Sequence, residues 1–274
     1  MLDLAIASRH APCVIAVKLL FLVSALLATT SSALANPYAF STGTPGNQLA
    51  AASQPGSAFK EAADDFVLPL QTTLTSGTFT GLLPSGASHF SISAVFVKIY
   101  RVFPLDSTDP APPGSPTRIN SPSDAAYDER DTTTDSLIVS FTVLNPSFSA
   151  LNSVLNGIHP APNNLTLGEG PVSGAEGLMS LTFVPAITLP AGHYFFVAQV
   201  ALFSGDFYWL SGSRPIVSPG TPFASDQQAW IRNANLAPNW LRIGTDIIGS
   251  GSSFNLAFTL SGEDDRIFGD TFGQ

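Results

Sequence analysis

Alternation of apolar and polar side chains with a period of two is the feature that most constrains this fold. In the segment SFNLAFTLS, residues 253–261, the Phe and Leu side chains point to one side and the Asn, Ala, Thr and Ser side chains to the other. Successive side chains of an extended strand point to opposite faces, so this segment is predicted to be a strand with one buried face. The segment LIVSFTVL, residues 137–144, repeats the pattern.

A further segment is apolar on both faces, which predicts a central strand. Residues 193–203, HYFFVAQVALF, carry large apolar side chains at odd and at even positions. Strands that are covered on both faces have this composition. The step Gly205-Asp206 follows, and FYWLS at residues 207–211 is predicted to return as the hairpin partner.

Proline-rich stretches separate the predicted strands. Residues 104–122, 159–171 and 214–225 contain repeated prolines, which cannot donate backbone hydrogen bonds, so these stretches are predicted to be exposed loops. A short helix is predicted over Ser147–Leu155, where three large apolar side chains fall on one helical face. With about eight to ten strands and no internal repeat, the predicted fold is all-β. We expect a single jelly-roll-like antiparallel β-sandwich with long Pro/Gly-rich loops.

The N-terminal 35 residues have the organisation of a secretory signal peptide. A basic start precedes an apolar run from Val14 to Ala28, and the small residues Ala33-Leu34-Ala35 form a cleavage box. The alternative is an uncleaved anchor, because the run approaches the roughly 20 residues that span a bilayer. We expect cleavage, a sandwich domain over residues 36–262 and an acidic flexible tail over residues 263–274. The predicted location is secreted, periplasmic or at the cell surface, without stable membrane insertion after cleavage.

The charge balance argues against some partners. The chain has 11 basic and 20 acidic residues, a net charge of −9. Such a surface repels nucleic acid and anionic lipid, so neither is an expected partner. Charged residues make up 11% of the chain, about half the usual share of roughly 25%, which suits an extracellular β-protein solvated by Ser, Thr and Asn.

Sequence motifs of catalysis are missing. The chain contains no G-x-S-x-G, no H-E-x-x-H, no P-loop and no dinucleotide fingerprint, so no catalytic residue is predicted. A carboxylate pair of a carbohydrate-active hydrolase or lyase remains the alternative, with Asp64, Asp65, Glu176 and Asp206 as candidates.

Calcium is the one cofactor that the sequence brings into question. The segment SDAAYDERDTTTD supplies Asp124, Asp128, Asp131 and Asp135, but it lacks the D-x-D-x-D-G loop, and Arg130 would oppose a cation. A solvated acidic loop is the favoured interpretation.

Aromatic residues near arginines are the candidate ligand site, because saccharides stack on exposed rings while edge groups form hydrogen bonds. The candidates are Tyr208, Trp209, Trp230, Arg232, Trp240 and Arg242. The competing interpretation is an apolar lid over the end of the sandwich, since large aromatic residues are more often buried. We expect Trp230 to be part of a strand and Trp240, which follows Pro238-Asn239, to be exposed.

Several segments of this chain resemble motifs of a known group of proteins. The motifs ADDFVL, SGTFTGLL, VFVKIYRV, LPAGHYFFVAQV and FNLAFTLSG occur between residues 40 and 262 in an order that resembles secreted bacterial jelly-roll β-sandwich modules of mostly unknown function. The end DDRIFGDTFGQ resembles short acidic I-F-x-D-x-F tails of exported proteins of Gram-negative bacteria, although it ends Thr-Phe-Gly-Gln instead of Gly-Phe-Glu. The resemblance implies a fold and a compartment, and it implies no reaction.

Together these features predict an exported, non-catalytic β-sandwich protein that acts outside the cell or at its surface. We expect a binding or structural module whose partner is a saccharide or another component of the envelope or matrix. A purely structural envelope protein and a carbohydrate-active enzyme are the alternatives that stay open.

Overall fold

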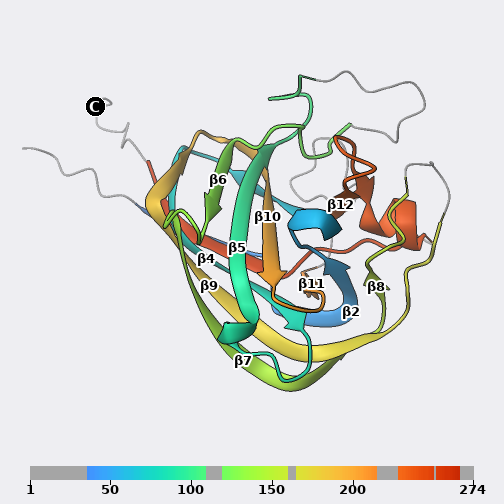
Figure 1. Ribbon diagram of the computed structural model, residues 1–274. Coiled ribbons are helices and arrows are strands. Elements are labelled where there is room, and N and C mark those ends of the chain that lie inside the picture. Colours follow the sequence, from blue (N-terminus) through green and yellow to red (C-terminus); the bar gives the residue numbers. More distant parts are fainter. Residues whose placement is uncertain (1–35, 109–118, 160–164, 215–227, 250, 266–274) are drawn as a thin grey trace, which may run out of the picture. The chain divides into compact units, whose positions relative to one another are not determined.

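Two β-sheets packed face to face make up the described part of the protein (Figure 1). The computed structural model describes residues 36–108, 119–159, 165–214, 228–249 and 251–265. The predicted all-β sandwich is therefore confirmed. The predicted signal peptide lies outside the described residues, as does residue 266 onward of the predicted tail. Within the described ranges, no helix has the length and apolar character needed to cross a bilayer.

The larger sheet contains eight strands. They are β1 (Asn36–Ser41), β2 (Pro45–Ala52), β4 (Thr72–Leu83), β7 (Leu137–Ala150), β8 (Ser153–Val154), β9 (Val172–Leu189), β11 (Tyr208–Gly212) and β14 (Phe258–Asp264). The long strand β4 pairs with β9 on one side and with both β14 and β11 on the other. Strand β7 pairs with β9, and β1 pairs with β14. All of these pairs are antiparallel, whereas β2 and β8 are parallel.

The smaller sheet has the order β13-β12-β3-β10-β5-β6. Its strands are β3 (Lys60–Leu68), β5 (Ile92–Arg101), β6 (Asp128–Asp131), β10 (Gly192–Leu202), β12 (Trp230–Asn233) and β13 (Leu241–Arg242). Three short helical segments connect the strands, η1 (Gly56–Ala58), η2 (His89–Ser91) and η3 (Ile243–Ile248). Strand β10 is central, and both Phe195 and Phe196 on its opposite faces are fully buried, as the sequence predicted.

The main core lies between the two sheets and contains a group of aromatic rings. The Phe196 ring from one sheet stacks on the Phe258 ring from the other, with centroids 5.0 Å apart. The Trp209 ring meets Phe196 edge-on at 5.8 Å, and its Nε1 donates a hydrogen bond of 2.8 Å to the carbonyl oxygen of Ala257. Burying these rings removes a large apolar area from water, and this burial is the main source of folding free energy.

The structure corrects three details of the sequence-based prediction. Strand β11 is not the hairpin partner of β10, because it belongs to the other sheet and pairs with β2 and β4. The connection through Gly205 therefore crosses between the sheets, and side-chain alternation does not distinguish such a crossing from a hairpin. The helix expected over Ser147–Leu155 is wrong, since β7 continues to Ala150 and β8 follows. The last strand also extends to Asp264, two residues past the predicted domain end.

Candidate functional site

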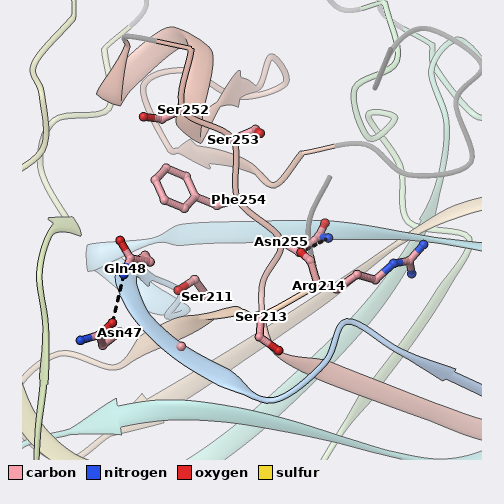
Figure 2. Close-up of a pocket in the computed structure, with 11 residues that line it drawn as sticks. Asn47, Gln48, Ser211, Ser213, Arg214, Ser252, Ser253, Phe254 and Asn255 are labelled. Carbon is pink, nitrogen blue, oxygen red and sulfur yellow. Dashed lines mark hydrogen bonds between the residues drawn. The ribbon is translucent and has the colours of Figure 1, made fainter. Parts of the chain in front are cut away.

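An open groove lies where β2, the end of β11 and the segment before β14 meet (Figure 2). Its volume is about 560 Å³, and residues 46–48, 211–214 and 252–255 line it. Figure 2 shows Phe254 extending from its segment, with Gln48 below the ring in this view. We call this site the amide groove, after the side chains of Asn47, Gln48 and Asn255.

The groove exists because the pairing between β11 and β2 is interrupted. Their register shifts between Leu210 and Gly212, so residues 46–49 of β2 are left out of the pairing before Gly212 pairs with Pro45. The amide of Gly212 then donates to the carbonyl oxygen of Asn255 at 2.7 Å, which fixes the segment 252–255 beside β11. A Cβ atom on Gly212 would lie 2.6 Å from the carbonyl oxygen of Thr42, so a glycine is required at this close approach.

Neutral hydrogen-bonding groups dominate the lining. The amide side chains of Asn47 and Gln48 are exposed, and none of the residues that line the groove is a carboxylate. Arg214 is the one charged residue in the described part of the lining, and its guanidinium lies 5.3 Å from the centre of the Phe40 ring. Asn255 is 1% exposed, and its Nδ2 donates to the carbonyl oxygen of Arg214 at 3.1 Å. Its Oδ1 has no hydrogen-bond partner among the described residues.

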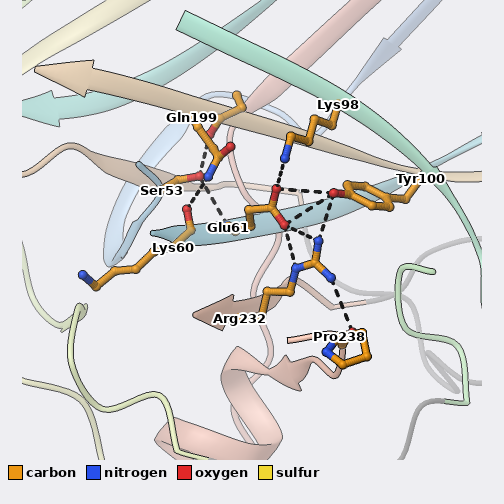
Figure 3. A network of polar contacts seen from close by, with 10 residues as sticks. Ser53, Lys60, Glu61, Lys98, Tyr100, Gln199, Arg232 and Pro238 are labelled. Atoms are coloured by element: carbon orange, nitrogen blue, oxygen red, sulfur yellow. Dashed lines mark hydrogen bonds and ion pairs between the residues drawn. The ribbon is translucent and has the colours of Figure 1, made fainter. Parts of the chain in front are cut away.

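A second polar cluster is formed by side chains of β3, β5 and β12 in the smaller sheet (Figure 3). The side chain of Glu61 is fully buried, and it accepts hydrogen bonds of 2.6 Å from Lys98 Nζ and of 2.6 Å from Arg232 Nε. Arg232 Nη2 also donates to the Tyr100 hydroxyl at 3.0 Å. We call these four residues the Glu61 network. A buried carboxylate requires such partners, because desolvation of an unpaired charge costs several kcal/mol.

Aromatic rings enclose the Glu61 network. The Arg232 guanidinium lies 4.2 Å from the centre of the Trp240 ring and 5.4 Å from that of Tyr100, and these two rings meet edge to face with centroids 5.8 Å apart. Burial raises the pKa of Tyr100, and the neighbouring negative charge of Glu61 raises it further. The phenol is therefore neutral and acts as a hydrogen-bonding part of the structure.

The six residues predicted to bind a ligand do not form one exposed site. Trp209 and Trp240 are 0% exposed and Trp230 is 2% exposed, so the exposure expected for Trp240 is wrong. Trp240 is buried because its ring covers the guanidinium of Arg232. The preceding residues Pro238 and Asn239 give no indication of this contact. Arg242 forms an ion pair of 2.8 Å with Asp246.

Tyr208 is the one half-buried ring among the six. It borders a smaller cavity of about 160 Å³ together with Asp206 and Ser173. Burial raises the pKa of Tyr208 to about 12, with smaller contributions from the charges of Asp206 and Glu169.

The four aspartates considered for calcium have separate partners. Asp128 forms an ion pair of 2.7 Å with Arg130, and Asp131 accepts backbone hydrogen bonds from residues 133 and 134. Asp124 accepts a hydrogen bond from the Ser107 hydroxyl. Asp135 is exposed and has a positive φ of 57°. Among the described residues, no three acids, histidines or cysteines are grouped as metal ligands. The preference for a solvated acidic loop over a calcium site stays a prediction.

The four carboxylates considered for hydrolysis lie on different parts of the sandwich. Asp64 accepts the backbone amide of Leu256 at 2.7 Å, whereas the adjacent Asp65 contacts His193 Nε2 at 2.5 Å. Asp206 precedes β11 and accepts a hydrogen bond from Gln54 at 2.9 Å. Glu176 lies on β9, 8% exposed, and burial raises its pKa.

Comparison with protein-family models, curated proteins and solved structures found no match for this chain. The site is therefore defined by its geometry. Sequence reasoning did not identify the Glu61 network or the amide groove. The pattern KEAADDF, with acids inside an apolar strand, is the signal that indicates the first. The second has no sequence signal, because the three segments of the groove are distant along the chain.

Proposed function

We propose that this protein is an exported, non-catalytic binding module of the cell surface or extracellular matrix, and that its amide groove holds a saccharide. The observation that carries the proposal is the lining of the groove. Exposed amides, serine hydroxyls and one phenylalanine ring surround an open volume of about 560 Å³. Pockets for small ligands usually measure about 300–1,000 Å³.

The chemistry of the lining suits a neutral polyhydroxylated ligand. Amide side chains both donate and accept hydrogen bonds, so they match sugar hydroxyl groups, which do the same. The Phe254 ring is partly buried against the main core, which fixes the position of the face that a sugar ring would cover. The buried Oδ1 of Asn255 lacks a donor, and a rearrangement that brought it to a ligand hydroxyl would satisfy it.

The groove is a better candidate than the tryptophan–arginine cluster. Trp230 and Trp240 are buried, so a sugar could stack on them only after the covering segments had opened. The groove needs no such opening, because Asn47 and Gln48 already contact solvent.

The test is binding of neutral and acidic oligosaccharides, first on a glycan array and then by titration calorimetry. The double variant Asn47→Ala/Gln48→Ala should weaken retention at least about tenfold, the loss that corresponds to about 1.4 kcal/mol. Asn235→Ala is the matched control, since Asn235 is an exposed asparagine that does not line the groove. Wild-type protein that retains no glycan contradicts the proposal, and so does equal weakening by the control. Cleavage of a retained glycan would contradict the non-catalytic assignment.

A further inference from the structure

The free edge of β7 is an unusual surface in this protein. Among the described residues β7 pairs with β9 alone, so it forms an edge of the larger sheet (Figure 1). An antiparallel edge strand turns the N–H and C=O groups of every second residue away from its sheet. Leu137–Val143 pairs with β9 in one uninterrupted register, which leaves about 23 Å of regular backbone available on the other side.

This edge lacks most of the features that usually prevent strand pairing. Natural edge strands carry charges, prolines or bulges that block a second chain. No charged residue occurs between Ser136 and Ile158, and Pro146 with its register shifts lies beyond the regular part. The exposed side chains include Ile138, which is 59% exposed. In a chain of net charge −9, this is a place where two molecules can approach with little repulsion.

Two exposed phenylalanines lie near the same edge. Phe90 in η2 is 77% exposed and Phe203 after β10 is 75% exposed, more than any other large apolar side chain of the described residues. The amide of Phe203 donates to the carbonyl oxygen of Ser91 at 3.1 Å, so the two rings belong to adjacent segments. Segment η2 lies beside β7 (Figure 1). Exposed apolar side chains gathered in this way mark an interaction surface.

We propose that the β7 edge, together with Phe90 and Phe203, is the contact surface of a symmetric dimer of this chain. Two copies of β7 would pair antiparallel across a twofold axis and continue the larger sheet into the partner. A second copy fits better than a lone peptide, because the two phenylalanines need a folded surface opposite them. An uncharged strand rich in β-branched residues pairs best with a strand of the same composition. A second copy of β7 has that composition. Twofold dimers are the commonest symmetric assemblies.

The test is the molar mass of the full chain, measured by sedimentation and light scattering over a concentration series. Ser140→Lys and Thr142→Lys place a charge on exposed positions of the regular edge. Ser261→Lys is the matched control, because Ser261 is also exposed but β14 is paired on both sides. Phe90→Ser and Phe203→Ser test the rings separately. Circular dichroism establishes that each variant is folded.

We expect a wild-type dimer whose dissociation constant rises about tenfold or more with each lysine on β7, and also with the loss of either ring. The control should leave the dissociation constant unchanged. Wild-type protein that stays monomeric at millimolar concentration overturns the proposal. An equal effect of Ser261→Lys, or assembly into open-ended oligomers, also overturns it.

Discussion

The Glu61 network and the amide groove are both polar, yet they differ in charge and in access to water. The network contains one carboxylate and two cations, with the Glu61 side chain 0%, the Arg232 side chain 7% and the Lys98 side chain 20% exposed. The groove contains amides and hydroxyls, of which those of Asn47, Gln48, Ser213 and Ser253 are exposed. Buried charged groups must form ion pairs and hydrogen bonds with one another to offset the free-energy cost of desolvation. Their donors and acceptors are then not available to a ligand. Neutral groups in water can exchange their hydrogen bonds with a ligand at small cost. In this protein, dense charge marks structure and neutral polarity marks a candidate site.

The largest expected effect on the free energy of unfolding comes from removing the Trp240 ring, which packs on the Glu61 network. Trp240→Ala should lower the free energy of unfolding by about 3–5 kcal/mol, because a cavity replaces a fully buried ring and Arg232 loses its stacking partner. Chemical denaturation monitored by circular dichroism measures this change. A loss below about 1 kcal/mol, the size of an ordinary surface substitution, would show that Trp240 is exposed and that the comparison is wrong.

The charge of the network provides the next test. Glu61→Gln keeps the shape but leaves Lys98 and Arg232 without a counter-charge, so we expect a loss of about 3 kcal/mol in unfolding free energy. Asp106→Asn is the matched control, since it removes the partner of the more exposed Arg101 and should cost less than about 1 kcal/mol. Similar losses for both variants would mean that the network is not desolvated.

Glu176 is a buried acid that forms no ion pair with a described residue. Its pKa is raised by burial, so the folded state binds the proton more tightly than the unfolded state does. This contribution to stability is present below the unfolded pKa of about 4.3 and is lost as pH rises through the higher folded value. Glu176→Gln should therefore raise the melting temperature at pH 7 and have no such effect below pH ~4. A melting temperature that falls at pH 7 would contradict the assignment.

The smallest expected effect is at the groove. Gln48→Ala removes an exposed amide, so the free energy of unfolding should change by less than about 0.5 kcal/mol. Thermal unfolding in parallel with the glycan titration separates binding from folding. A loss of several kcal/mol would place Gln48 in the structure and not in a ligand site.

Period-two alternation was sufficient to predict the fold class, and the two apolar faces of residues 193–203 correctly predicted a central strand. Alternation did not predict to which sheet β11 belongs. The pattern describes a single strand, whereas pairing depends on strands that are distant along the chain. The position of Trp240 was missed for a related reason. Its environment is created by Arg232 and Tyr100, which lie on two other strands. The amide groove likewise arises from three segments that only the folded chain brings together.

The position of β14 has a consequence for the order in which the chain can fold. This last strand lies between β1, the first, and β4, so the larger sheet is incomplete until residues 258–264 are available. Pairings between such distant segments form slowly, because a long loop must close before any contact compensates for its entropy. We expect the chain to remain unfolded during synthesis and to collapse only after its C-terminal strand has emerged. An unfolded chain is also the form that can be threaded through a narrow translocation channel.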